Sequence, residues 1–145
     1  MTDTERTFTV TPPVPIVVNY LKDFAHAEEW DPGTQSCTRT DDGPIGVGST
    51  WHNVSKIAGK KTELSYTLRT LAEDRLTFVG ENSSATSTDD ITLAADSGGT
   101  RITYHSHIEF HGVAKLAGPL AKPIFERLGN ETEARLTEVL NALDH

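Results

Sequence analysis

The sequence predicts an α+β fold in which a curved antiparallel sheet closes around one long C-terminal helix. Between Thr34 and Phe110, short segments with strand-like patterns are separated by turn-forming residues. After Gly112, apolar residues recur at helical spacing as far as Leu143. A single amphipathic helix that follows a run of strands buries its apolar face by packing across the sheet.

The N-terminal part predicts one strand and two short helices. Thr7–Thr11 alternates bulky apolar residues with threonine, which is typical of a half-buried strand. Three prolines at positions 12–15 mark a helix start, because the backbone donor that proline lacks has no partner in a first turn. A second helical piece, Ala25–Trp30, ends at the turn signal Asp31-Pro32-Gly33.

Six further segments have the composition of strands. They are Gln35–Thr40, Ser49–Ile57, Thr62–Leu71, Arg75–Asn82, Thr86–Ala95 and Arg101–Phe110. The breaks between most of them are short and rich in Gly, Asp and Ser, which suits hairpins. This spacing favours an antiparallel meander over parallel strands joined by helices.

The C-terminal helix has a continuous apolar stripe, which we expect to face the sheet. Its members are Val113, Leu116, Ala117, Leu120, Ile124, Leu128, Leu136, Val139, Leu140 and Leu143. Pro119 and Pro123 interrupt the pattern and predict a break or kink, with Pro123 beginning the well-formed second half. Two interpretations stay open: a static bend that follows the sheet, or an adjustable mouth formed by Val113–Lys122.

Composition limits the classes of function. The 145 residues suit a single domain over residues 1–145, large enough to bury ~70% of the surface of its unfolded chain. The net charge of −8 disfavours nucleic acid and anionic membrane surfaces as partners. The chain has one cysteine, Cys37, no apolar segment of signal-peptide type and no apolar run of ~20 residues. We therefore expect a cytoplasmic protein without stable membrane insertion, and the sequence leaves its oligomeric state open.

Strand parity predicts a mostly apolar inner face that includes a few polar side chains. A buried amide or hydroxyl without a partner costs ~1–3 kcal/mol, so Asn53, Ser55 and Ser106 must meet a side chain, a water or a ligand. Each has a local explanation, but as a group they favour a ligand cavity. The predicted ligand-binding residues are Trp51, Tyr66, Phe78, Tyr104 and Ile124 for apolar contact, and Asn53, Ser55 and Ser106 for orientation.

Few patterns indicate chemistry. His105, His107, Glu109 and His111 alternate along one strand and could converge on an ion, but parity places them on the outer face. We expect a solvated histidine row, no metal and no cofactor. Asp89 shares parity with inward residues and would titrate high if buried, although an exposed position fits the irregular strand better.

The short helices should close one end of the cavity. We expect Trp30 to plug this end and His26 to lie on a helix surface. The alternative is that these two residues and Asp31 border the ligand entrance.

The order of several motifs resembles that of the START-like superfamily, and within it the bacterial polyketide cyclase/dehydrase and lipid-transport group. The motifs are a proline-rich helix start, Trp30-Asp31-Pro32-Gly33, Gly46-Val47-Gly48-Ser49, Gly98-Gly99-Thr100-Arg101-Ile102-Thr103-Tyr104 and the long last helix. The resemblance implies a helix-grip fold with about seven strands, two short helices after the first strand, and a cavity for a hydrophobic or aromatic molecule. Cyclases of this group use polar cavity residues that orient a chain and assist proton transfer.

Three functions remain open from the sequence. The leading hypothesis is a binding protein for a small, lipid-like or polyketide-like ligand. A cyclase/dehydratase-type enzyme would need inward titratable groups, for which Tyr66, Tyr104 and Asp89 are the candidates. A protein-interaction module would have a filled core. A cavity under ~100 Å³ favours the module, since ligand pockets usually measure ~300–1,000 Å³, and a roomy cavity with a buried titratable pair favours the enzyme.

Overall fold

A computed structural model describes residues 2–145, without the side chain of Ala117. The described residues form one seven-stranded sheet with the order β1-β7-β6-β5-β4-β3-β2. All neighbouring strands are antiparallel. The strands are β1 (Thr2–Val10), β2 (Thr34–Arg39), β3 (Thr50–Ile57), β4 (Lys60–Leu71), β5 (Arg75–Glu81), β6 (Ala85–Asp96) and β7 (Gly99–Phe110).

The predicted strands and their antiparallel order are confirmed, and six of the seven agree to within two residues at each end. The exception is β1, which begins at Thr2 rather than at Thr7. Its first residues are polar and carry no strand pattern. They are strand because they pair with β7, in a register that runs from Thr2 opposite Ile108 to Val10 opposite Thr100.

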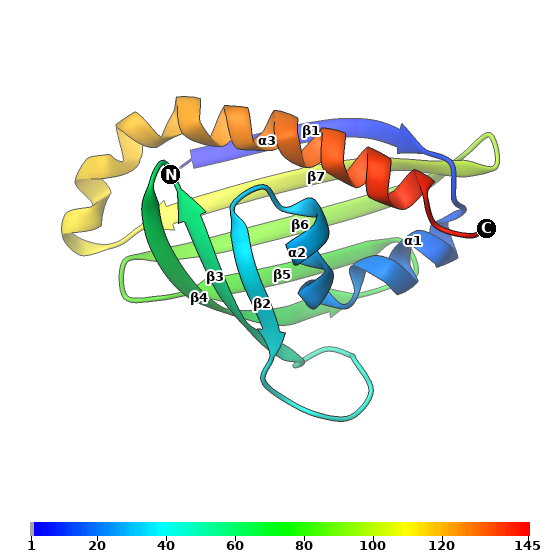
Figure 1. Cartoon of the computed structure of the whole chain (residues 1–145), viewed down its shortest axis with the longest axis horizontal. Helices are drawn as coiled ribbons and strands as arrows, with labels where there is room; N and C mark the ends of the chain where they lie inside the picture. The colour runs from blue at the N-terminus through cyan, green and yellow to red at the C-terminus, as the bar shows by residue number, and fades with distance from the viewer. Residues whose placement is uncertain (1) are drawn as a thin grey trace.

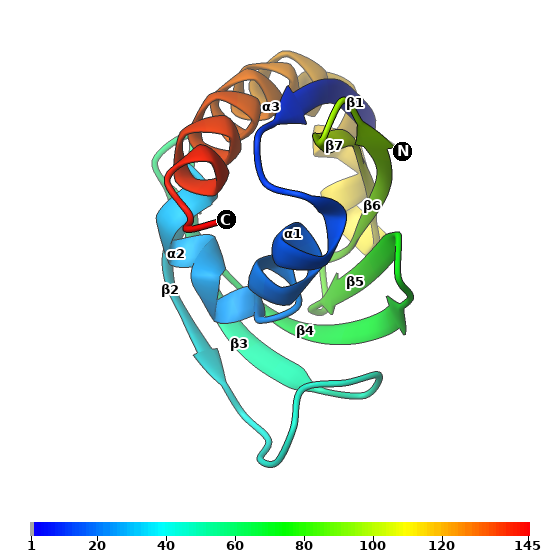
Figure 2. The same ribbon diagram turned by 90° about the vertical axis from the view of Figure 1, so that its right-hand side faces the viewer.

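The helices cover the concave side of the sheet. They are α1 (Val14–Leu21), η1 (Phe24–His26), α2 (Ala27–Trp30), η2 (Gly112–Ala117) and α3 (Gly118–Asn141). Figure 1 shows α3 crossing the sheet beside β1. In the end view of Figure 2, the sheet curves from β1 round to β2, and α1 lies in the opening. The helix-grip fold expected from the sequence is confirmed.

The predicted interruption of the last helix is present, but it lies earlier than the sequence suggested. The short 3₁₀ helix η2 passes into α3 at Gly118, so that Pro119 occupies the first turn of the α-helix. Pro123 lies inside α3 and does not begin it. Its position close to the helix start omits only the backbone bond to the carbonyl of Pro119.

The large buried side chains of α3 belong to its C-terminal half, and in the first half the small side chain of Ala121 is buried. Leu136 and Leu140 are fully buried, and each such side chain contributes ~1.5–3 kcal/mol to burial. By contrast, Val113, Leu116 and Leu120 are 88%, 83% and 75% exposed. The prediction that the whole apolar stripe faces the sheet is therefore wrong for its first part. Figure 1 shows that η2 and the start of α3 extend past the ends of the strands.

An aromatic cluster fills the interior below α1 and α2. Phe24 lies at its centre, with ring centroids 4.4 Å from Tyr66, 4.5 Å from Phe78 and 6.2 Å from Trp51. Its ring also meets Trp30 edge-on at 6.0 Å. Aromatic pairs in such geometries add ~0.5–1.5 kcal/mol to the burial of their area.

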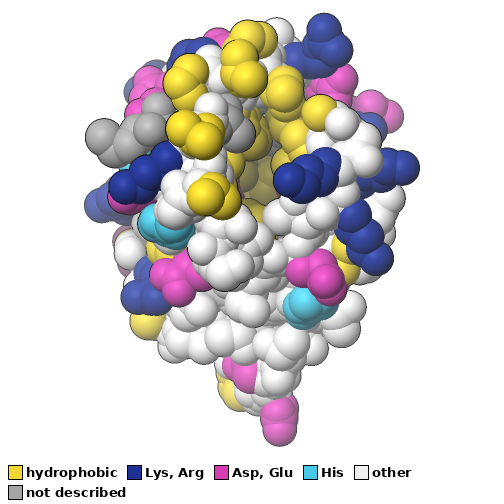
Figure 3. All heavy atoms as spheres, turned by 90° about the vertical axis from the view of Figure 1, so that its left-hand side faces the viewer, with side chains coloured by type: hydrophobic (Ala, Val, Ile, Leu, Met, Phe, Trp, Pro, Cys, Tyr) yellow, Lys and Arg dark blue, Asp and Glu magenta, His cyan; other side chains and the backbone are white. Residues whose placement is uncertain are grey.

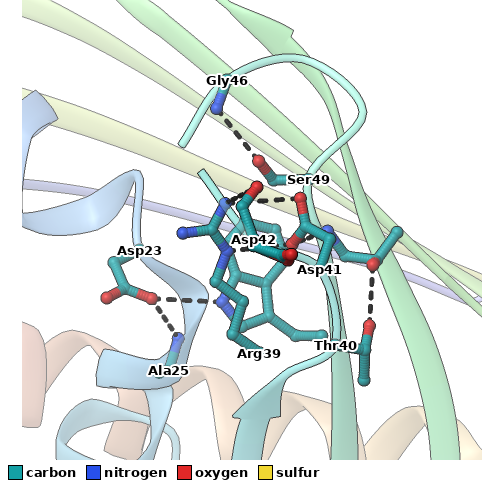
Figure 4. A network of polar contacts seen from close by, with 10 residues as sticks. Asp23, Ala25, Arg39, Thr40, Asp41, Asp42, Gly46 and Ser49 are labelled. Atoms are coloured by element: carbon teal, nitrogen blue, oxygen red, sulfur yellow. Dashed lines mark hydrogen bonds and ion pairs between the residues drawn. The ribbon is translucent and has the colours of Figure 1, made fainter. Parts of the chain in front are cut away.

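One carboxylate fixes the short helices to the sheet. Asp23 Oδ1 accepts hydrogen bonds from the Ala25 amide, which caps η1, and from the indole Nε1 of Trp51 on β3, both at 3.1 Å. Figure 4 shows these contacts beside the loop that joins β2 to β3, where the Arg39 guanidinium pairs with Asp41 at 2.9 Å. The polar group of Trp51 is thereby satisfied within the core.

A glycine on β5 determines where the Tyr66 side chain lies. Tyr66 on β4 is opposite Gly80, and Gly80 is opposite Ser87 on β6. A Cβ atom on Gly80 would lie 2.6 to 2.8 Å from the Tyr66 ring. The ring therefore lies directly over this glycine, with Ser87 on the next strand beyond it.

Gly80→Ala should lower the free energy of unfolding by about 1–3 kcal/mol, because the added methyl group displaces the buried Tyr66 ring. Urea denaturation measures the change. Gly46→Ala is the matched control, since a Cβ there meets nothing within 4 Å, and it should change stability by less than about 0.5 kcal/mol. Equal effects of the two substitutions would contradict the assignment of close packing at Gly80.

Candidate functional site

A small, partly open cavity, called the internal cavity below, lies between the sheet and α3. Its volume is about 90 Å³. The lining combines side chains of four strands with one face of α3 and the turn after α2. It consists of Thr4, Asp31, Tyr66, Ser87, Asp89, Tyr104, Ser106, Ile108, Phe125, Leu128, Gly129 and Thr132.

Asp89 is the central polar group of this cavity. It lies opposite Ser106 in the β6–β7 register, and alternation places Ser87 and Ile91 on the same inner face. The residue is only 6% exposed. The expectation that Asp89 is exposed is therefore wrong, because β6 keeps a regular inward alternation as far as Leu93.

The environment of Asp89 favours its protonated form. Burial raises the pKa of Asp89 to about 7, and the negative charge of Asp31 adds to the effect. Hydrogen bonds with Tyr104 and Ser106 act in the opposite direction and lower that pKa in part. A carboxyl group with such a pKa exchanges its proton near neutral pH.

The turn after α2 brings a second carboxyl group to the cavity. Asp31 Oδ1 accepts a hydrogen bond from the Gly33 amide at 3.1 Å, and Oδ2 accepts one from the Thr34 hydroxyl at 2.8 Å. Burial raises the pKa of Asp31, whereas these two hydrogen bonds and the charge of Arg135 lower it. The sequence identified the turn and considered Asp31 only as an alternative border residue.

Two tyrosines complete the polar lining. Burial, and secondly the charge of Asp89, raise the pKa of Tyr66 and of Tyr104 well above the ordinary value. Both hydroxyls therefore keep their protons and remain hydrogen-bond donors. Together with Asp89, they are the three residues that the sequence proposed for acid–base chemistry, and all three line one cavity.

The eight predicted ligand-binding residues do not lie together in one place. Tyr66, Tyr104 and Ser106 line the internal cavity. Trp51 and Phe78 are completely buried within the aromatic cluster. The other three, Asn53, Ser55 and Ile124, lie outside both.

The polar groups of Asn53 and Ser55 satisfy one another. Ser55 Oγ donates to Asn53 Oδ1 at 2.6 Å, and Asn53 Nδ2 donates to the Thr34 hydroxyl at 3.0 Å. These two side chains thus need no ligand, and the local explanation considered from sequence applies to them. Ile124 is 37% exposed and lines an outer groove rather than the internal cavity.

The outer groove lies next to the cavity. Its volume is about 340 Å³, and it runs between the β3–β4 turn and the first half of α3. The lining is Pro32, Lys56, Ile57, Ala58, Pro123, Ile124, Arg127, Leu128 and Glu131. Leu128 is the one residue named in the lining of both spaces, so that the groove and the cavity adjoin at this side chain.

Apolar side chains surround this end of the molecule. Figure 3 shows hydrophobic atoms gathered around a hollow, with lysine and arginine side chains beside it. The exposed apolar residues of η2 and early α3 are Val113, Leu116, Leu120 and Ile124. A larger depression, about 970 Å³, lies between α1 and the β4–β5 turn and contains none of the cavity residues.

The cavity meets one condition set from the sequence in full and another only in part. Its volume of about 90 Å³ is below the ~100 Å³ under which the sequence analysis favoured a protein-interaction module. However, its lining includes a pair of carboxyl groups, Asp31 and Asp89, which a core built only for stability would avoid because burying charge is costly. The pair is the feature expected of an acid–base site.

The two residues expected to close one end of the cavity, Trp30 and His26, both have aromatic partners. Trp30 is 2% exposed and meets the Tyr104 ring edge-on at 5.9 Å, as a plug would. His26 is half-buried and stacks on Tyr20 with 4.2 Å between the ring centroids. Among the described residues, two buried polar atoms have no partner, Trp30 Nε1 and Thr4 Oγ1.

The histidine row has partners of its own. His105 Nε2 and His107 Nδ1 lie 3.0 and 2.7 Å from Asp3 Oδ1 on β1. His111 Nε2 lies 2.8 Å from the Thr86 hydroxyl instead. The four side chains of the row therefore do not converge on one point.

No helix within residues 2–145 combines the length and the apolar character needed to cross a membrane.

Solved structures share this fold at low sequence identity. The protein TTHA0849 from Thermus thermophilus is 15% identical, with a TM-score of 0.80 and coverage of 97% of each chain. A START superfamily protein from Mycobacterium smegmatis is 16% identical, with a TM-score of 0.68 and coverage of 96% of this chain and 94% of that one. The Zhui aromatase/cyclase from Streptomyces sp. R1128 is 12% identical, with a TM-score of 0.72 and coverage of 96% and 90%.

Sequence comparison gives the family. No curated protein sequence matches the chain. Residues 1–142 match the family model described as polyketide cyclase / dehydrase and lipid transport. The match extends over the whole helix-grip fold, and the structural neighbours include START-superfamily members. The chain therefore belongs to the polyketide cyclase/dehydrase and lipid-transport family.

Proposed function

We propose that this protein binds a small, largely apolar molecule between α3 and the sheet, with the polar end of the molecule in the internal cavity. The observation that carries the proposal is the position of Leu128, which lines both a polar cavity and an outer groove with a partly apolar lining. The outer groove alone, at about 340 Å³, has the size of a ligand pocket. A molecule that displaced Leu128 would have a polar end inside and an apolar body outside.

Family membership supports this proposal. The family is described by polyketide cyclisation and lipid transport, both of which involve largely apolar molecules. A neighbour with a TM-score of 0.75 and 13% identity is named as a STAR-related lipid transfer protein from Xanthomonas axonopodis, and the match covers 95% of this chain and 85% of that one. At such identity, the neighbour supports the fold, and the binding function is argued from the cavity.

The first half of α3 is held by contacts that can open. Arg6 Nη2 donates to the Glu126 carbonyl at 2.9 Å, and Arg6 Nε donates to Asn130 Oδ1 at 3.0 Å. Glu126 also forms surface ion pairs with Arg6 and Lys122, at 3.4 and 3.5 Å. Exposed pairs of this kind contribute about 0–1 kcal/mol, much less than the buried leucines of the second half.

Hydrogen exchange should reveal this difference along one helix. We expect the amides of residues 120–128, apart from Pro123, which has none, to exchange at least about tenfold faster than the amides of residues 134–140, because opening there exposes little apolar surface. Mass spectrometry of the exchanged peptides measures both segments in one experiment. Equal protection in the two segments would contradict an opening at α3.

A neutral aromatic probe tests the binding function. The fluorescence of naphthylmethanol should be quenched or shifted when the probe binds. Leu128→Trp should weaken this binding by at least about tenfold, because the indole would fill the space where groove and cavity adjoin. Asn19→Trp is the matched control, because Asn19 lines the separate depression between α1 and the β4–β5 turn, and it should leave the affinity for the probe unchanged. Equal affinities of the wild-type protein and both variants would contradict the proposed location, and the absence of binding to the wild type would contradict this probe's use of the cavity.

A second candidate function, acid–base catalysis of the cyclase/dehydratase type, is favoured by Asp89. With a pKa of about 7, this carboxyl group is able both to accept and to donate a proton at neutral pH. Tyr66 and Tyr104 would donate hydrogen bonds to a developing oxyanion in the same cavity. The titration of Asp89 within the folded protein is the first requirement of this candidate.

Asp89→Asn tests that titration through stability. The pKa of Asp89 is about 7 in the folded protein and 3.8 without the fold, so the folded state holds a proton that the unfolded state has lost between these values. The wild-type protein should therefore lose on the order of 4 kcal/mol relative to the variant as pH rises from about 4 to about 7, and no more above that. Denaturation of both proteins across this range measures the difference. A difference that does not vary with pH would contradict the raised pKa.

A further inference from the structure

We propose that the polar end of the bound molecule is a protonated amine, held by the carboxylates of Asp31 and Asp89 and by the Thr4 hydroxyl. The inference rests on the binding function proposed above and specifies the chemical class of its ligand.

The charge of the cavity is the first argument. Two carboxyl groups line it, and none of the described lining residues is Lys, Arg or His. Buried carboxylates are normally paired with a cation or with several hydrogen-bond donors. A ligand ammonium group would supply the missing positive charge, whereas a carboxylate or phosphate would add repulsion.

The neighbouring cations are engaged elsewhere or do not line the cavity. Arg6 lines a smaller adjoining pocket of about 30 Å³ and binds Asn130 and the Glu126 carbonyl. Arg135 on α3 is exposed, and its charge has the smallest of the four effects on the pKa of Asp31. The protein therefore leaves the Asp89 carboxylate without a partner of opposite charge among the residues that line the cavity.

Thr4 provides an independent argument. Its hydroxyl oxygen is buried without a hydrogen-bond partner, the residue is only 7% exposed, and it lines the cavity. An unpaired buried hydroxyl costs about 1–3 kcal/mol. A primary ammonium group has three donors and no acceptor, so one donor can reach Thr4 while the other two reach the carboxylates.

The size of the cavity fits a head group and not a whole ligand. About 90 Å³ corresponds to roughly three water molecules at ~30 Å³ each. An aminomethyl group is of this size. An aromatic or aliphatic body would lie beyond Leu128 in the outer groove, beside Ile57 and Ile124.

The titratable groups around Asp89 predict how affinity depends on pH. Asp31 faces it from the turn after α2, Tyr66 from β4 and Tyr104 from β7, while Arg135 on α3 acts on Asp31. Cys37 on β2 affects Tyr66, and burial raises the pKa of its thiol to about 12. Asp89 is therefore the group that ionises near neutral pH, and its ionised form attracts a cation.

Three probes with the same ring test the inference. Naphthylmethylamine carries an alkylammonium group that, like that of Lys, stays protonated well above neutral pH. Naphthylmethanol is its neutral counterpart, and naphthoate is an anion. We expect the amine to bind about tenfold or more tighter than the alcohol at pH values above about 7, with the advantage shrinking as pH falls through the pKa of Asp89. Naphthoate should bind weakest.

Substitutions locate the effect. Asp89→Asn should lower the affinity for the amine by about tenfold or more and leave the alcohol within about twofold. Thr4→Val removes only the unpaired hydroxyl and should weaken the amine several-fold without lowering stability. Asp90→Asn is the matched control, because the Asp90 side chain is on the outer face and pairs with Arg75 at 2.9 Å. This control should leave the affinity for the amine unchanged.

The outcomes separate the two proposals. If the alcohol binds as tightly as the amine, or if Asp89→Asn leaves the affinity for the amine unchanged, the ammonium inference is wrong and the binding function stands. If the amine loses affinity equally in Asp89→Asn and Asp90→Asn, the effect is general electrostatic attraction to an acidic protein, which also overturns the inference. If none of the three probes binds, both proposals fail together.

Discussion

The attachment of α3 to the sheet is the constraint on which the cavity depends. Leu136 and Leu140 fix the second half of the helix through burial, while the first half rests on polar contacts with β1. Gly129 lies between the half of α3 held by buried leucines and the half held by polar contacts. A Cβ atom on this glycine would approach the Thr4 methyl group to 2.8 Å. The helix can lie this close to β1 because the glycine has no side chain. The cavity is the space that remains between this contact and the inner strands.

The interior is divided into an apolar part and a polar part. The aromatic cluster around Phe24 lies under α1, η1 and α2, and its one indole donor from the sheet is satisfied by Asp23 (Figure 4). The polar side chains gather instead under α3, where Asp89, Tyr104 and Ser106 face the helix from neighbouring strands. Stability and chemistry are thus assigned to different regions of one concave surface. Burial of a carboxyl pair lowers stability, and the adjacent apolar cluster offsets that cost.

Much of the fold could be predicted from the sequence, because alternation and helical spacing report burial directly. Parity alone placed Tyr66, Tyr104 and Ser106 on the inner face. Helical spacing placed Ile124 against the sheet, whereas it lines the outer groove, because periodicity shows that a helix has an apolar side and not whether the sheet extends beneath it. Parity also suggested a ligand for Asn53 and Ser55, whose mutual hydrogen bond depends on side-chain geometry that spacing does not contain.

Sequence reasoning missed Thr4, considered Asp31 only as a border residue, and named Asp89 as an acid–base candidate while expecting it to be exposed. Thr4 lies in a polar segment that is strand only because β7 pairs with it. Asp31 is part of a turn signal in the sequence. Its place in the cavity lining depends on where α3 lies, which local sequence does not show. Strand parity placed Asp89 on the inner face, but the sequence did not show that β6 keeps its alternation regular through this residue.

The contact between Tyr66 and Gly80 has a consequence for how such proteins diverge. The two residues occupy one volume, since any side chain at the glycine would enter the space of the phenol ring. A relative that carries a larger residue in place of Gly80 must therefore have a smaller one in place of Tyr66, and would lose the phenol from the cavity lining by the same exchange. Coupled substitution at this pair would alter the shape and polarity of the cavity while the backbone stayed unchanged.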